Sequence, residues 1–240
     1  MYNLLWKKII LCFFTVLFVA ELSAQKEQYR IGHDDLPYYF GATLGYNVGY
    51  LSAKKSEKFL ADDSVLVAEP AASGGITIGL HATVRLAKHW QARFNPQIIL
   101  GGARYFNYTL NSKYNTNEPI EQRYTLPTTL LSFPLSLKFN SDRIDNFRTY
   151  LLFGVKADVD LSANSAARNQ EGYIKLKKFN YGAEAGIGFN LFLKYFTLTP
   201  ELKISYGFNN ILDRDPNLKY SAVFESIQSR MIMFTLHFED

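Results

Sequence analysis

The chain has 240 residues, of which 48% are hydrophobic, 15% aromatic and 20% charged, and its formal net charge is +4. A disordered chain would be poorer in aromatic residues, and a disulfide scaffold needs more than the single Cys. The net charge is too small for a dedicated nucleic-acid binder, and a mean hydropathy of −0.11 argues against a bundle of membrane-spanning helices. The length fits one aromatic-rich β domain.

The N-terminus has the features of a secretory signal peptide. Lys7 and Lys8 form a basic start, and an apolar run of 12 residues follows at Ile9–Ala20. This run is too short to cross a membrane comfortably as a retained anchor helix. We therefore expect cleavage after residues 1–24. Cleavage also removes Cys12, the only cysteine, so that the mature chain has no disulfide or thiol chemistry.

Apolar and polar residues then alternate with a period of two in eight segments. Successive side chains of a β-strand point to opposite faces, so this alternation predicts eight strands with two different environments. In the first segment, Tyr38–Tyr50, one face carries mainly Tyr, Phe, Leu and Val, and the other carries mainly Gly, Thr and Asn. The segments have roughly the 9–11 residues that tilted membrane strands require. The other seven are residues 75–87, 90–100, 130–140, 147–161, 179–189, 198–208 and 231–238.

The connections between these segments alternate in length. Short turns on the periplasmic side and long loops on the outer side are typical of outer-membrane barrels. An even strand count places both termini in the periplasm, with residues 25–36 as a periplasmic N-terminal arm and residues 37–240 as the barrel domain. The short turns are residues 88–89, 141–146 and 192–195, and the long loops are residues 51–74, 111–123, 162–177 and 210–226.

Two closed eight-stranded folds compete for this pattern. A soluble calyx turns its apolar face inward, whereas a membrane barrel turns it toward lipid. The polar faces are rich in Gly, which a narrow barrel interior needs, and the opposite faces carry bulky side chains suited to lipid. We therefore predict an all-β, eight-stranded antiparallel up-and-down transmembrane β-barrel. The last strand also resembles the C-terminal signal for barrel-insertion machinery, with Ile232, Phe234, Leu236 and Phe238 on one face.

The predicted lumen carries charges of both signs. A barrel of eight strands is only wide enough for side chains to fill its interior, and charges in such a space must be paired. We therefore expect an ion-pair plug in preference to the alternative, a small selective channel. The predicted members of this plug are Arg85, Arg93, Lys138, Arg148, Lys156, Asp158, Asp160, Glu184, Glu201 and Lys203.

No catalytic set emerges from the histidines. His33 lies in the arm and His89 in a turn, while His81 and His237 face the predicted lumen, and none stands on a long loop beside a Ser and an acid. We interpret the lumenal pair as structural, which disfavours a lipid-modifying enzyme. We expect no cofactor, metal site, small-molecule substrate or nucleic-acid partner.

Several blocks resemble the PorT-type outer-membrane proteins of the Bacteroidota. These are residues 131–139 (LSFPLSLKF) with the following DNFR at 145–148, the ending at 229–239 (SRMIMFTLHFE), and the first predicted strand. The resemblance implies an accessory or assembly role in the type IX secretion system, and in gliding motility where that occurs. It implies outer-membrane lipid, barrel-insertion machinery and other type IX components as partners, and no catalytic residues. The alternative is a general adhesin or an envelope-stabilising barrel not tied to secretion.

Overall fold

The computed structural model describes residues 27–57, 59, 65–101, 104–111, 113, 119–126, 128–163, 175–213 and 223–240. The predicted signal peptide, residues 1–24, and its cleavage site lie outside these ranges. A search of the described residues finds no helix with the length and apolar character of a membrane span.

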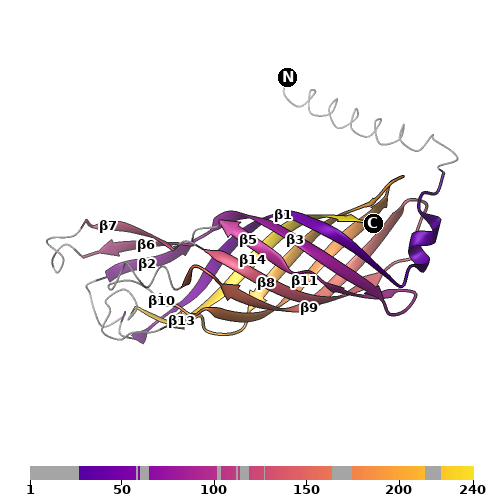
Figure 1. The fold of residues 1–240 in the computed structure, drawn as a ribbon. Helices are drawn as coiled ribbons and strands as arrows, with labels where there is room; N and C mark the ends of the chain where they lie inside the picture. Colours follow the sequence, from indigo (N-terminus) through magenta and orange to yellow (C-terminus); the bar gives the residue numbers. More distant parts are fainter. Residues whose placement is uncertain are drawn as a thin grey trace, which may run out of the picture.

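An antiparallel sheet of nine strands closes on itself to form the barrel (Figure 1). Its order is β1-β14-β12-β11-β9-β8-β4-β3, with β5 also lying between β3 and β8, and a pairing between β1 and β3 completes the ring. Neighbours along the chain are neighbours in the ring, which is the predicted up-and-down topology. The strands are β1 (Tyr38–Lys55), β3 (Ser73–Arg85), β4 (Trp90–Phe94), β5 (Gln97–Gly101), β8 (Thr129–Asn140), β9 (Phe147–Asp160), β11 (Phe179–Phe192), β12 (Thr197–Gly207) and β14 (Phe224–Glu239).

The sheet has nine strands where the sequence predicts eight, because the predicted third strand is divided at Asn95 and Pro96. Both parts, β4 and β5, pair with β3 on one side and with β8 on the other. Pro96 lacks the N–H that a continuous ladder requires, and so does Pro134 of β8, which lies opposite Asn95. The Asn95 N–H donates to the Pro134 carbonyl over 3.1 Å, which ties the two strands together at the break.

The two faces of the barrel wall carry opposite chemistry. Large apolar side chains point outward and are well exposed, as in Phe40 (61%) and Leu80 (68%), whereas inward-facing polar side chains such as Thr77, Ser132 and Lys138 are fully buried. This is the arrangement of a barrel surrounded by lipid and the reverse of a soluble calyx. The predicted all-β membrane-barrel fold is therefore confirmed.

The predicted insertion signal lies on the outer face of β14. Ile232, Phe234 and Phe238 are 40–49% exposed, and Leu236 between them is half-buried. Each alternates with an inward-facing residue that is buried, so this last strand continues the lipid-facing surface up to the C-terminus.

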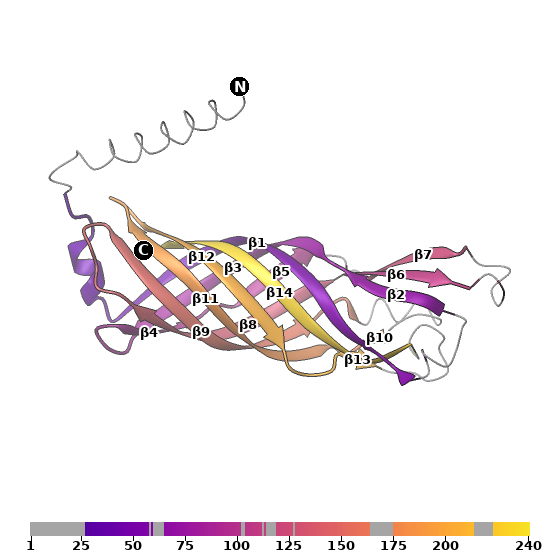
Figure 2. The ribbon, with the colours of Figure 1, turned by 180° about the vertical axis from the view of Figure 1, so that it is seen from behind.

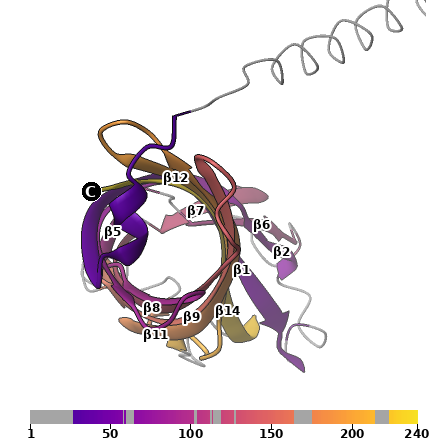
Figure 3. The same ribbon diagram turned by 90° about the vertical axis from the view of Figure 1, so that its right-hand side faces the viewer.

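The two ends of the barrel differ (Figures 1 and 3). At one, here called the arm end, residues 27–36 with the 3₁₀ helix η2 (Ile31–Asp35) lie at the mouth of the barrel near the C-terminus. At the other, here called the loop end, a second sheet extends beyond the barrel. It consists of β2 (Val65–Ala71), β6 (Arg104–Leu110) and β7 (Glu121–Leu126), and a short pair is formed by β10 (Lys175–Leu176) and β13 (Leu212–Asp213).

These extensions enclose an apolar cluster of their own, here called the loop-end core. Phe106 and Phe224 are fully buried in it, with ring centroids 5.4 Å apart. The segments at this end therefore contain paired strands with a core, where the sequence predicts long loops. Its buried members are Leu51, Val65, Ala68, Phe106, Tyr108, Leu110, Ile211, Leu212, Val223, Phe224 and Ile227.

Candidate functional site

The lumen is the candidate functional site, and Arg93 of β4 is its centre. The Arg93 guanidinium donates to the Glu201 carboxylate over 2.7 Å and to the Glu239 carboxylate over 3.0 Å. All three side chains are at most 2% exposed. Strand β12, which carries Glu201, stands opposite β4 in the ring. The two bonds of Arg93 therefore cross the width of the lumen.

Two lysines extend this network. The Lys203 Nζ lies 3.4 Å from Glu201 and 4.0 Å from Glu184, and the Lys138 Nζ lies 3.8 Å from Glu239. These side chains are also at most 2% exposed. Buried charges are tolerable only when paired, and here the two signs balance. The lumenal network, as named hereafter, sets Arg93, Lys138 and Lys203 against Glu184, Glu201 and Glu239.

Neutral side chains add hydrogen bonds to two of these carboxylates. The Tyr150 hydroxyl donates to Glu201, and the Ser136 hydroxyl donates to Glu184 over 2.7 Å. The Tyr150 ring also lies 4.1 Å from the Lys138 Nζ, within the range of a cation–π contact. Buried charged and polar side chains therefore occupy the space between the walls.

The two lumenal histidines support the same carboxylates. The Nε2 atom of His81 lies 3.4 Å from Glu239, and that of His237 lies 3.4 Å from Glu201. Their Nδ1 atoms share the Thr43 hydroxyl, at 3.2 and 2.9 Å. These contacts are those of positioning residues. In the part of the chain that the structure covers, no group of three or more His, Cys, Asp or Glu side chains is placed to hold a metal ion.

Three further members of the predicted plug lie toward the loop end, apart from the lumenal network. Lys156 and Asp158 form a pair of their own at 2.8 Å, and the Asp158 carboxylate accepts hydrogen bonds from Ser132 and Asn180. Asp160 ends strand β9 and accepts the N–H of residue 162 over 2.9 Å. The predicted plug is therefore divided along the barrel.

The last two predicted members, Arg85 and Arg148, lie at the arm end and bind the N-terminal arm. Arg148 lies 2.7 Å and Arg143 3.2 Å from the Asp34 carboxylate. Arg85 donates to the main-chain carbonyl of Asp34 and lies 3.4 Å from the Asp35 carboxylate. Three arginines of the barrel therefore converge on Asp34 in η2, where they fix the arm at the mouth.

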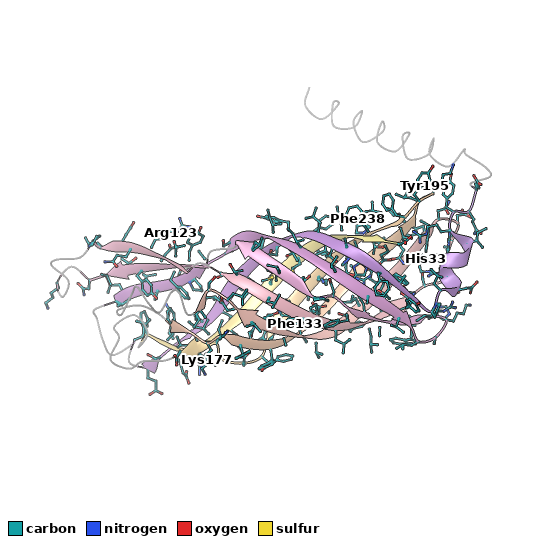
Figure 4. All side chains as sticks on the ribbon, in the orientation of Figure 1. His33, Arg123, Phe133, Lys177, Tyr195 and Phe238 are labelled. Atoms are coloured by element: carbon teal, nitrogen blue, oxygen red, sulfur yellow. The ribbon has the colours of Figure 1, made fainter. Side chains whose placement is uncertain are left out.

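His33 attaches η2 to the barrel through contacts with Tyr39, Phe192 and Asp240. Its ring centroid lies 4.8 Å from that of Tyr39 and 5.9 Å from that of Phe192, and its Nε2 atom lies 3.2 Å from the Asp240 carbonyl oxygen. Burial is the main cause that lowers the pKa of His33 below 6.5, and the nearby Arg30 charge lowers it further. The arm therefore docks with a neutral imidazole at the end of the barrel (Figure 4).

A family model described as an outer membrane protein beta-barrel domain matches residues 24–213. The chain belongs to this family. No curated protein matches this outer membrane barrel.

Several solved barrels are similar to it in fold. Neisserial surface protein A is 11% identical, with a TM-score of 0.40 over 83% of this chain and 96% of that chain. Ail of Yersinia pestis is 7% identical, with a TM-score of 0.38 over 85% and 100% of the two chains. OprG from Pseudomonas aeruginosa is 13% identical, with a TM-score of 0.38 over 83% and 93%.

Sequence reasoning missed three residues on which this outer membrane barrel depends. Glu239 extends the inward-facing series of β14 by one step, and Tyr150 belongs to the inward series of β9. Following each alternation to the end of its strand would have found both. Asp34 lies outside every alternating segment, so no sequence pattern pointed to it.

Proposed function

We propose that this outer membrane barrel is a non-catalytic accessory or assembly component of the type IX protein secretion system. The observation that supports this best is the filled lumen, because Arg93 and its two carboxylates occupy the width that a channel would need. The sequence similarity of residues 131–139 and 229–239 to PorT-type proteins supports the assignment to this system. The role proposed is that of a scaffold.

The proposed orientation places the arm end in the periplasm and the loop end outside the cell. The short turns at the arm end and the extended strands at the loop end support it, since outer-membrane barrels have short periplasmic turns. Binding sites on rigid scaffolds are concentrated in their connecting segments. The loop-end sheet β2-β6-β7 is accordingly the proposed contact region for secretion partners.

Deletion of the gene tests the proposed role. We expect proteins with C-terminal sorting domains to disappear from the medium and to accumulate in the periplasm, and the wild-type gene to restore their export. A variant in which residues 104–126 are replaced by a short Gly-Ser linker is expected to insert without restoring export. A Lys88→Gln variant, altered in an exposed turn at the arm end, is the matched control and should restore it. Unchanged export in the deletion strain would contradict the proposal.

Planar-bilayer recording tests the filled lumen separately. We expect the reconstituted wild-type barrel to give no stable, large openings, because the lumenal network spans the interior. Stable large openings of the wild-type protein would support a channel and overturn the scaffold proposal. Native affinity purification then identifies which secretion components accompany the barrel.

A general adhesin or envelope-stabilising barrel is the second candidate. The observation that favours it is the ordered loop-end sheet, which extends well beyond the barrel (Figure 1). Binding of a surface ligand to the loop end, together with purification free of any secretion component, would decide for this candidate.

A further inference from the structure

One arginine stands on the lipid-facing side of the barrel wall. Arg230 lies on the outer face of β14, directly before the outward-facing apolar series that runs from Ile232 to Phe238. On its other side, toward the loop end, the outward residues of the same strand are Gln228 and Ser226. Arg230 therefore marks the border of the apolar belt nearest the loop end.

Two tyrosines of the neighbouring strands hold this arginine. The register places Tyr50 of β1 and Tyr206 of β12 directly beside Arg230. The guanidinium carbon lies 4.9 Å from the ring centre of Tyr206 and 6.0 Å from that of Tyr50, both within the range of cation–π contacts. The Nε atom of Arg230 is shielded from solvent and has no hydrogen-bond partner. The guanidinium is therefore positioned by two neutral aromatic rings.

A trough runs along the outer wall beside this cation. Strand β11 presents the small residues Ala183 and Ala185 to the outside, whereas the register places the bulky Phe153 of β9 beside Ala185. On the other side, Ile204 and Tyr206 of β12 stand beside the same two alanines. Because these two small side chains lie between rows of larger ones, the outer surface is recessed along β11.

The trough has the size and lining of a ligand site. A pocket of about 530 Å³ covers this part of the wall and extends from Phe153 past the two alanines to Arg230 and Tyr50. Small-molecule sites typically have about 300–1,000 Å³, with mostly apolar walls and a few polar groups. The strands that form it, β9, β11, β12, β14 and β1, lie side by side in Figure 2.

An arginine at the border of an apolar belt is complementary to a lipid phosphate, because its planar guanidinium can bind phosphate oxygens through two parallel N–H donors. The apolar trough beside it is complementary to an acyl chain. We propose that Arg230 and the trough over Ala183 and Ala185 form a binding site for a phosphorylated acyl lipid. The phosphate binds Arg230 and one acyl chain lies along β11. In the orientation proposed above, this lipid is the phosphorylated glycolipid of the outer leaflet.

Native mass spectrometry of the full mature protein tests the site with three probes. These are bis-phosphorylated lipid A, lipid A without its phosphates, and inorganic phosphate. We expect the wild type to prefer the phosphorylated lipid, and Arg230→Met to bind it at least tenfold more weakly. Arg230→Lys should retain part of the preference, because it keeps the charge without the planar donors. Ala185→Trp should fill the trough and weaken lipid binding while Arg230 is retained.

The matched control is Lys54→Gln, which removes another cation near the loop end. Lys54 pairs with Glu225 at 2.7 Å, is well exposed and is not part of the trough lining, so lipid binding should be unchanged. Heat-modifiable migration on gels shows that each variant is folded, and Arg230→Gln replaces Arg230→Met if the latter fails to fold.

Three results would overturn the proposal. These are equal binding of phosphorylated and dephosphorylated lipid, unchanged binding by the folded Arg230 variant, and displacement of the lipid by inorganic phosphate at equal concentration. The last would identify a plain anion site. Because binding is measured on purified protein, this outcome is independent of any role in secretion.

Discussion

The barrel lumen is filled by ion pairs and hydrogen bonds around Arg93, whereas the loop-end core is filled by aromatic and aliphatic side chains around Phe224. Water surrounds the loop end, so burying apolar surface there is favourable. Inside the membrane the apolar side chains face lipid, and the interior is left to polar groups, whose bonds strengthen in a low dielectric. Each region should therefore respond differently to substitution.

The largest effect is expected from Arg93→Met. This change leaves Glu201 and Glu239 buried without the cation that they share, and loss of one partner from a buried ion pair costs about 3–5 kcal/mol. We expect the free energy of unfolding, measured with urea in lipid vesicles, to fall by about that amount. Lys88→Gln is the control, because Lys88 and its partner Asp142 are more than 70% exposed, and it should leave stability unchanged.

Similar stabilities for these two variants would show that the lumenal network carries no more energy than a surface pair. The buried ion pairs of Arg93 would then stabilise the barrel no more than the exposed pair of Lys88, and a stabilising interior would be excluded.

A substitution in the loop-end core should cause a local loss of structure and leave the barrel folded. Phe224→Ala removes a buried ring that packs against Phe106 and Tyr108, and such a change typically costs about 3–5 kcal/mol. Because the loop-end core lies beyond the barrel, we expect a local loss, seen as faster proteolysis of β6 and β7 with the barrel intact. Leu66→Ala, at a residue 51% exposed in the same sheet, should leave proteolysis unchanged. Global unfolding by Phe224→Ala would show that the two regions form one cooperative unit.

The same contrast explains what the sequence could predict. The eight barrel segments could be predicted because lipid lies on one side of each strand and a polar lumen on the other, so that apolar and polar residues alternate. The loop-end strands were missed because β2 and β6 are short, with seven residues each, although Phe106, Tyr108 and Leu110 of β6 do alternate with polar residues. Their burial comes from packing on Phe224 and Ile211, which lie far away in the chain.

The lumen could be predicted in composition but not in pairing. Ten charged residues were identified from the alternation, yet which of them meet depends on strand stagger and on the arm. Arg85 and Arg148 lie on inward-facing positions but near the arm end, where Asp34 is the available anion. The division at Asn95 and Pro96 follows from two prolines on neighbouring strands, a coincidence that no single strand pattern reveals.

A glycine substitution tests how tightly the lumen is filled. A Cβ atom on Gly79 would lie 2.7 Å from the Gln97 Cβ and 2.8 Å from the Pro96 carbonyl oxygen, closer than such atoms can approach. We expect Gly79→Ala to cost about 1–3 kcal/mol of unfolding free energy through overpacking. Gly32→Ala in the arm is the control, since nothing lies within 4 Å of its added Cβ. Equal stabilities would mean that the wall can yield and that the lumen is loosely packed.

The smallest expected effect is the effect of pH on the docking of the N-terminal arm at the arm end of the barrel. Burial lowers the pKa of His33 below 6.5, so the undocked arm takes up a proton more readily than the docked one. The stabilisation of the docked arm is therefore complete above pH 6.5, and it is lost as the pH falls from 6.5 through the lowered pKa. Arg30, Asp34, Glu239 and the Asp240 carbonyl surround the ring, and burial outweighs the acidic groups among them.

A spin label on Ile31→Cys, a position 67% exposed, reports the mobility of the arm without another thiol in the expected mature chain. We expect the label to become more mobile as the pH falls below 6.5, and His33→Gln to remove this dependence. An unchanged pH response in His33→Gln would assign the transition to the carboxylates of the arm end. A neutral His33 adds no further cation beside Arg143 and Arg148, which already pair with Asp34 and lie over the same Phe192 ring that His33 contacts.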